Sequence, residues 1–250
     1  MNLLQHINKK RRAGHKSLAV LIDPDTTSSQ EVARLVSLAH DAHVDYFFVG
    51  GSRVKPMDMD LVLGLLQDLT DIPIVIFPGS SNQLSEKADA LLFLSLISGR
   101  NPEFLIGKHV ESALFLHQSN LEVIPTGYML IDGGNVTSVA YVSNTTPIPH
   151  DKINIAISTA LAGQFLGMKL IYLEGGSGAH QHVSPAMTRA VKEALDIPLI
   201  VGGGIRNPES AAAIAQSGAD IIVIGNILEK DPELMIDLSA VIHATKTDSI

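Results

Sequence analysis

Three glycine-rich segments, each directly after an apolar run, lie in the last third of the chain. They are Gly175-Gly176-Ser177-Gly178, Gly202-Gly203-Gly204 and Gly225-Asn226. Glycine lets the backbone come close to an anion, and a helix that begins after such a loop directs free N–H groups and its positive dipole end at the anion. Glycines at tight strand-to-helix turns also serve packing, but three in a row exceed what a turn requires. The pattern predicts a phosphate site.

Glu174 is the acid that stands beside these glycines. It follows Tyr172 by two residues, so both side chains point to the same face of a strand, which could be the interior of a barrel. A carboxylate there can take a proton from a hydroxyl nucleophile, which the Tyr172 hydroxyl can orient. The alternative is a buried structural Glu whose oxygens accept loop N–H groups.

A second group of oxygen ligands follows the first two apolar runs. Asp23 closes the run 17–22, and Ser52 follows the run 45–49. Such oxygens suit a hard cation like Mg²⁺, which keeps several waters and phosphate oxygens. Asp23 before Pro24 is equally typical of a turn or helix cap, and the spacing leaves both interpretations open.

Histidine carries a weaker signal. His180 and His182 have a spacing that could chelate a metal. An exposed helix entrance explains them better, because nothing else in the sequence converges on them.

Short apolar runs alternate with amphipathic segments along most of the chain, which predicts βα units around a parallel sheet. The expected strands are 17–22, 45–49, 73–77, 90–96, 122–130, 169–173, 198–201 and 220–224. The expected helices include 29–42, 57–69, 103–117, 151–166, 184–195 and 208–217. Eight units in 250 residues predict one α/β domain over 1–250, a modified (β/α)8 (TIM) barrel whose active site lies at the C-terminal strand ends.

Two segments depart from this regular pattern. Residues 78–89 leave little room for a crossover helix, which predicts an open barrel wall there. The Gly133-Gly134 step within 128–139 predicts either a hairpin that extends the fifth strand or an ordinary loop.

Composition excludes several classes of protein. A net charge of -8 and a pI near 5.6 disfavour nucleic-acid binding. The lack of cysteine removes thiol nucleophiles and disulfides. Because no apolar run reaches the roughly 18 residues of a membrane span, and the N-terminus lacks a signal-peptide pattern, we expect a cytoplasmic protein without a membrane span.

Five strings of the sequence resemble the geranylgeranylglyceryl phosphate synthase family, which includes bacterial heptaprenylglyceryl phosphate synthases. They are collinear over nearly the whole chain: Leu21-Ile22-Asp23-Pro24-Asp25, Gly50-Gly51-Ser52, Pro125-Thr126-Gly127-Tyr128, Tyr172-Leu173-Glu174-Gly175-Gly176-Ser177-Gly178-Ala179 and Val201-Gly202-Gly203-Gly204-Ile205-Arg206. The resemblance implies a barrel that lacks its third helix. It also implies a Mg²⁺-dependent prenyltransferase that joins a polyprenyl diphosphate, here expected to be geranylgeranyl, to the C3 hydroxyl of sn-glycerol 1-phosphate.

The resemblance also implies roles for individual residues. Asp23 and Ser52 would hold Mg²⁺, and Glu174 would be the catalytic base. The glycerol phosphate would be bound by Tyr172, Leu173, Glu174, Gly175, Gly176, Ser177, Gly178, Gly203, Gly204, Gly225 and Asn226. Phe104 stands where the family places a bulky residue that limits the prenyl channel, although core packing explains it equally well.

The chain also departs from some relatives. Leu21 stands where some bacterial members carry Lys, which suggests the branch that resembles the archaeal enzymes. His180 stands where many relatives carry Pro, a change that leaves the expected phosphate ligands intact.

Other functions and partners follow from the same residues. A sugar-phosphate isomerase or lyase would use Glu174 to abstract a carbon-bound proton, and a non-catalytic glycerol-phosphate sensor would need neither Glu174 nor Asp23. We expect the prenyl tail to enter at the missing helix, beside Leu94, Leu96 and Ile97. A homo-oligomer, for which 153–166 is one candidate surface, and a transient membrane contact during product release are compatible with this function.

Overall fold

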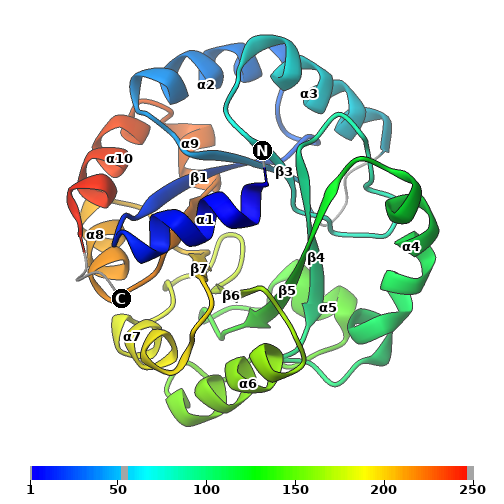
Figure 1. The fold of residues 1–250 in the computed structure, drawn as a ribbon. Helices are drawn as coiled ribbons and strands as arrows, with labels where there is room; N and C mark the ends of the chain where they lie inside the picture. The colour runs from blue at the N-terminus through cyan, green and yellow to red at the C-terminus, as the bar shows by residue number, and fades with distance from the viewer. Residues whose placement is uncertain (1, 52–55, 247–250) are drawn as a thin grey trace.

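The computed structural model describes residues 2–51 and 56–246 and shows a closed barrel of parallel strands (Figure 1). The strands are β1 (Ser17–Ile22), β2 (Tyr46–Val49), β3 (Ile74–Ile76), β4 (Ala90–Leu96), β5 (Glu122–Leu130), β6 (Leu170–Glu174), β7 (Leu199–Gly202) and β8 (Ile221–Ile224). They pair in sequence order, and β8 closes the barrel against β1. The predicted (β/α)8 fold is confirmed. The first and the last residue of each strand lie within one residue of the expected limits.

Helices surround the barrel (Figure 1). In chain order they are α2 (Ser29–Asp41), α3 (Pro56–Leu69), α4 (Lys108–Gln118), α6 (Ile153–Phe165), α7 (Pro185–Ala194), α8 (Pro208–Gln216) and α10 (Leu234–Ala244). A π-helical turn, η1 (Glu103–Gly107), leads into α4. Within 2–51 and 56–246, none of the helices combines the length and the apolar character that a membrane crossing requires.

Local signals set where several helices begin. Ser28 and Glu31 form a reciprocal capping box at the start of α2. Ser184 caps α7 and Asn207 caps α8, each by accepting a backbone N–H. Both of these helices continue with proline at a position that needs no N–H donor.

Alternation along the strands divides the core into two layers. Side chains such as Tyr46, Phe48 and Tyr172 fill the barrel interior, whereas their neighbours pack outward against the helices. Helix α1 (Leu3–Arg12) lies across the barrel in Figure 1, and its Leu3 and Ile7 join the interior layer. Side chains facing both ways are therefore buried, which explains why the strands are apolar throughout.

No helix lies between β3 and β4 in the described chain, where 78–89 forms turns, bends and irregular segments. The prediction that the third barrel helix is missing is therefore confirmed. The expected opening of the wall is wrong for the sheet itself, because Val75 pairs with Ala90 and Ile76 pairs with Leu91. Only the outer layer of helices is interrupted.

The segment that contains Gly133-Gly134 is a loop, so the hairpin alternative is wrong. Strand β5 ends at Leu130, and Ile131 forms a single parallel bridge with Ile148. A short helix, α5 (Ser138–Ser143), then begins after its Thr137 cap. This loop brings α5 to the mouth of the barrel, where Ser138 and Val139 line the cavity described below.

Candidate active site

A polar cavity of about 470 Å³ opens at the C-terminal ends of the strands. Loops after β1, β2, β6, β7 and β8 contribute to its wall. The predicted site residues among its lining are Asp23, Tyr172, Glu174, Gly176, Ser177, Gly178, Gly203, Gly204, Gly225 and Asn226. The structure thus brings the acid after β1 and the acid at the end of β6 into one cavity.

Three predicted residues stand apart from this lining. Leu173 is buried in the outer apolar layer, as alternation along β6 requires. The Gly175 N–H donates to the Gly202 carbonyl at 2.9 Å and so continues the strand pairing rather than facing the cavity. Ser52 lies outside the described residues.

Glu174 is the buried acid of the cavity, with 7% of its surface exposed. Its Oε1 accepts the Gly176 N–H at 2.6 Å. Burial raises the pKa of Glu174 above its ordinary value of 4.5, and the Gly176 N–H and the Tyr172 hydroxyl offset that rise only in part. A carboxylate held in this way is a better proton acceptor than an exposed glutamate, and the loop N–H fixes its position.

Tyr172 lies beneath Glu174 on the same face of β6, as the two-residue spacing predicts. Its ring stacks on Phe77 with centroids 5.4 Å apart and meets Tyr128 edge-on at 5.3 Å. Its buried hydroxyl lies close enough to Glu174 to lower the pKa of that carboxyl, and it has no other hydrogen-bond partner within 2–51 and 56–246. A Cβ at Gly202 would lie 2.5 Å from that hydroxyl, so glycine makes room for it. The hydroxyl therefore lies beside the candidate base, where a group that orients a nucleophile is needed.

The triple-glycine loop packs directly on Glu174. Gly203 has φ +81°, and a Cβ there would lie 2.3 Å from Glu174 Oε1 and 2.5 Å from the Gly176 nitrogen. Only glycine satisfies both the left-handed backbone and this close approach. The loops after β6 and β7 are thus held against each other around the carboxylate.

Helix starts complete the anion-binding character of this wall. Helix α9 (Asn226–Lys230) begins directly after β8, and Ser177 Oγ donates to Asn226 Oδ1 at 3.2 Å. The first N–H groups of a helix have no partner within it, so they are available to phosphate oxygens.

Three charged residues of the cavity were missed from the sequence: Arg206, Glu229 and Lys230. Arg206 donates to the Ala179 carbonyl at 2.5 Å, which ties the triple-glycine loop to the loop after β6. Its position directly after a predicted phosphate loop was the available signal. Glu229 and Lys230 lie on the short helix α9, which no periodicity predicted.

Asp23 lies at the other side of the cavity. Its Oδ1 accepts the Asp25 N–H at 3.1 Å, so the turn interpretation is correct for that oxygen. Burial raises its pKa, and a Cβ at Gly51 would lie 2.6 Å from Oδ2. Burial is also the main cause of a raised pKa at Glu229, and the charge on Asp23 adds to it. These acids repel each other across a region where no basic partner of Asp23 is described.

His180 and His182 do not form a metal site. His180 is exposed, and the His182 ring pairs through Nδ1 with the Val183 carbonyl at 2.7 Å. Across 2–51 and 56–246, no cluster of three or more histidine and acidic side chains is arranged to hold a metal. The interpretation as a helix entrance fits this placement.

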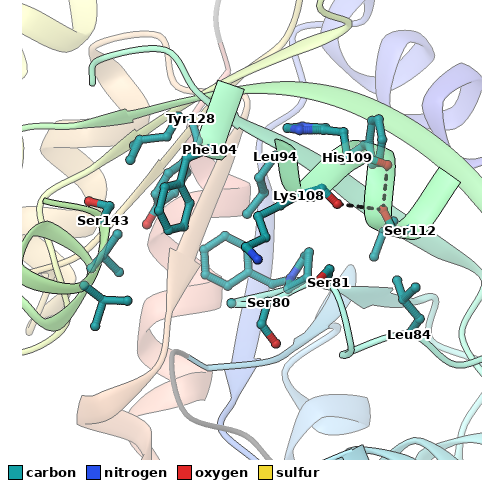
Figure 2. A pocket seen from close by; sticks show the side chains of 18 of the residues that line it. Ser80, Ser81, Leu84, Leu94, Phe104, Lys108, His109, Ser112, Tyr128 and Ser143 are labelled. Atoms are coloured by element: carbon teal, nitrogen blue, oxygen red, sulfur yellow. Dashed lines mark hydrogen bonds between the residues drawn. The ribbon is translucent and has the colours of Figure 1, made fainter. Parts of the chain in front are cut away.

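An apolar cavity adjoins the polar one at the missing third helix (Figure 2). Both cavities share Gly51, Phe77, Tyr128 and Val139 as lining residues. Leu94 and Leu96 line the apolar cavity as expected, and Phe104 of η1 lines it as well. Ile97 does not, because it points to a separate groove beside α6.

The family model of PcrB matches residues 8–244. The chain belongs to the PcrB family. It is 50% identical to the geranylgeranylglyceryl phosphate synthase of Chitinophaga pinensis over 94% of this chain and 93% of that protein.

Solved structures agree with this membership in the PcrB family. The (S)-3-O-geranylgeranylglyceryl phosphate synthase of Thermoplasma acidophilum, crystallised in complex with its substrate sn-glycerol-1-phosphate, is 39% identical with a TM-score of 0.93. That match covers 98% of this chain and 100% of the other. The enzyme of Thermoplasma volcanium has the same TM-score at 36% identity, over 99% and 100% of the two chains.

Membership in the PcrB family confirms the resemblance stated from the motifs and, with it, the prenyltransferase class of enzyme. The glycine loops and Glu174 that carried the resemblance are the parts of this chain that form the polar cavity.

Proposed function

We propose that this PcrB-family enzyme transfers a polyprenyl group, most simply geranylgeranyl, from its diphosphate to the C3 hydroxyl of sn-glycerol 1-phosphate. One observation carries the proposal: a glycine-lined polar cavity that holds Glu174 shares a wall with an apolar cavity. A small phosphorylated alcohol fits the first, and a hydrocarbon tail fits the second. The substrate named for the Thermoplasma acidophilum relative supports the choice of phosphate.

The glycerol phosphate would lie against the loops after β6, β7 and β8. Helix starts and close-approaching glycines favour its phosphate, and Arg206 and Lys230 add positive charge to the same cavity. Holding the phosphate there fixes the distance at which a glycerol hydroxyl can reach Glu174. Binding is thus converted into orientation of one hydroxyl.

The chemical step is a displacement at an allylic carbon. The C3 oxygen of glycerol phosphate forms a bond to C1 of the prenyl group, the bond from C1 to the diphosphate oxygen breaks, and Glu174 accepts the hydroxyl proton. The Tyr172 hydroxyl, which lies beside Glu174, would orient the attacking oxygen.

Asp23 fits a Mg²⁺ site of the kind completed by substrate. Mg²⁺ is commonly held by one or two carboxylates together with waters and phosphate oxygens. Asp23 supplies one half-buried carboxylate with no described basic partner, beside a second acid, Glu229, whose pKa its charge raises. Bound there, Mg²⁺ would neutralise charge on the departing diphosphate.

Asp23→Asn tests this metal assignment. We expect a higher Mg²⁺ concentration for half-maximal activity and weaker Mn²⁺ binding by the apoprotein, measured by electron paramagnetic resonance. Asp41→Asn, which changes an exposed acid at the far end of α2, serves as the matched control. An Asp23→Asn protein with unchanged metal titrations would remove the assignment.

The transferase proposal is tested by incubating the protein with labelled sn-glycerol 1-phosphate, Mg²⁺ and prenyl diphosphates of increasing length. We expect label in an organic-extractable product that resists mild acid, as an ether does. Absence of such a product with every donor would contradict the proposal. An isomerase or lyase would have no use for the adjoining apolar cavity.

We also propose a homo-oligomer that uses the outer face of α6. Ile155, Phe165 and Leu166 are 48%, 80% and 77% exposed there, which is unusual for large apolar side chains close together in sequence. Solution mass measured for the wild type and for Phe165→Glu tests this. A monomeric wild type would contradict it.

A further inference from the structure

The irregular connection 78–89, which stands in place of the third barrel helix, carries one fully buried amide. Ser80, Ser81 and Leu84 of this connection line the apolar cavity (Figure 2). Gln83 lies between them in sequence and is only 1% exposed. Burying a primary amide is costly unless its polar atoms are paired. The partners of Gln83 therefore indicate what its side chain does.

The Gln83 amide joins the loops that follow two neighbouring strands. Its Oε1 accepts the Gly79 N–H of the loop after β3 at 2.7 Å. Its Nε2 donates to the Gly51 carbonyl of the loop after β2 at 3.0 Å. The first of these backbone groups can only donate and the second can only accept. An amide answers both, whereas an ionised carboxylate could not donate to Gly51 and an apolar side chain could do neither.

Gly51 is the residue through which this contact reaches the polar cavity. A Cβ built on it would lie 2.6 Å from Asp23 Oδ2 and 2.9 Å from Oδ1, so the Asp23 carboxylate packs directly against its backbone. Gly51 also lines both cavities, and Gln83 is not among the residues that line either. The position of the loop after β2 therefore limits where the Asp23 carboxylate can lie.

The Asp23 carboxylate has little else to hold it. Within 2–51 and 56–246, the one hydrogen bond described for it is the Asp25 N–H to Oδ1 at 3.1 Å. Oδ2 is placed mainly by its packing against Gly51. Because Mg²⁺ demands near-ideal octahedral geometry, a small shift of this loop should cost metal affinity.

We propose that Gln83 is a positioning residue for the diphosphate end of the prenyl donor: it holds Gly51 where that backbone keeps the Asp23 carboxylate in the wall of the polar cavity. This inference rests on the proposed function, because it takes Asp23 to hold Mg²⁺ together with the diphosphate. The connection that replaces the third helix thus serves both parts of the donor. Leu84 lines the cavity for the tail, and Gln83 fixes the loop beside the metal.

The test measures Mn²⁺ binding to the apoprotein by electron paramagnetic resonance, so that it does not depend on turnover. Gln83→Met keeps the length of the side chain and removes both hydrogen bonds. Ser85→Ala is the matched control, because Ser85 is buried in the same connection but pairs with Asp60 of α3 rather than with the loop after β2. Asp23→Asn, alone and combined with Gln83→Met, completes a double-mutant cycle.

In Gln83→Met we expect Mn²⁺ to bind about tenfold more weakly than in the wild type, the usual size of one lost hydrogen bond. KM for geranylgeranyl diphosphate should rise as well, whereas affinity for sn-glycerol 1-phosphate should stay unchanged. Ser85→Ala should bind Mn²⁺ as the wild type does. In the Asp23→Asn background, Gln83→Met should cause no further loss, because the group that Gln83 positions is gone.

A second substitution covers the case in which the methionine variant does not fold. Gln83→Asn keeps the amide, but its side chain is one methylene too short to reach both Gly79 and Gly51. We expect the same weakening of Mn²⁺ binding, again without a change in affinity for glycerol phosphate.

Four results would overturn the inference: no Mn²⁺ binding by the wild type, unchanged binding in the Gln83 variants, an equal loss in Ser85→Ala, or a full effect of Gln83→Met in the Asp23→Asn background. The proposed function fails in a different way. The expected changes in Mn²⁺ binding without any ether product would remove the transferase and leave the positioning of Asp23 by Gln83 intact.

Discussion

Glu174 shows how function and stability oppose each other at one residue. Its burial raises its pKa, which means that the folded protein holds the charged form less favourably than the unfolded chain does. The Gly176 N–H and the absence of a side chain at Gly203 reduce this penalty without removing it.

Glu174→Gln should therefore separate the two properties. We expect turnover to fall by about 10² to 10⁴-fold, the usual contribution of a positioned general base, while glycerol phosphate still binds. The variant should also unfold at a higher temperature than the wild type at pH 8, measured by differential scanning fluorimetry. Equal loss of binding and turnover would instead assign Glu174 to the phosphate ligands.

The pH dependence of the rate follows from the same raised pKa. Only ionised Glu174 can accept the proton, so kcat/KM, which reports the pKa of the free enzyme, should fall as the pH drops through the folded-state pKa. Because that pKa lies above the ordinary value of 4.5, the fall in rate at acidic pH should also have its midpoint above 4.5. An acidic limb at or below that value, measured with chemistry rate-limiting, would contradict the role of Glu174 as the base.

At the scale of elements, the contact between the loops after β6 and β7 is the most sensitive part of the site. Gly203→Ala should reduce kcat/KM by about a hundredfold, because a Cβ there displaces Glu174 or Gly176 by a sizeable fraction of an ångström. Gly167→Ala is the matched control: it has φ +93° and nothing within 4 Å of the added carbon. Both substitutions impose backbone strain, so only the loss of activity should distinguish them.

The sequence predicted the strands and the capped helices well, because each kind of element carries a pattern that recurs along the chain. Buried strands are continuous apolar runs bounded by turns, and their ends were placed within one residue. Helices with caps, such as α2 and α8, were equally clear. Helix α9 is too short for a period to be visible, so it was missed.

Strand alternation explains which parts of the site were predicted correctly. It placed Tyr172 and Glu174 on one face, and the structure agrees. The same rule separates Leu94 and Leu96 from Ile97, which the sequence argument had wrongly grouped at one channel. His109, which also lines the apolar cavity, owes its position to the packing of α4 against β4, and no local pattern specifies that contact.

At the scale of the whole molecule, Asp45 joins the two ends of the chain to the barrel. Its carboxylate accepts the Leu18 N–H of β1 at 2.8 Å and pairs with His243 of α10 at 2.9 Å and with Lys10 of α1. Burial alone would raise the pKa of Asp45, but these partners hold it below its ordinary value. Its ionisation thus stabilises the fold at neutral pH.

Asp45→Asn should lower the free energy of unfolding at pH 7 by about 1 to 3 kcal/mol, since buried partners of a charged group are left poorly paired. A depressed pKa gives stability that is present above the unfolded-state value and lost as the pH falls through the folded-state value. The difference between variant and wild type should therefore shrink in acid. Urea unfolding at several pH values measures it, with the exposed Asp68→Asn as control, and a pH-independent difference would contradict the role of the charge.

The most direct test of the account is a crystal structure with sn-glycerol 1-phosphate and an unreactive prenyl thiolodiphosphate bound together. The account predicts the phosphate at the loops after β6, β7 and β8, and the C3 hydroxyl between Glu174 and prenyl C1. The tail should run past Tyr128 into the apolar cavity. A glycerol phosphate whose hydroxyl points away from Glu174, or a prenyl tail outside the apolar cavity, would contradict it.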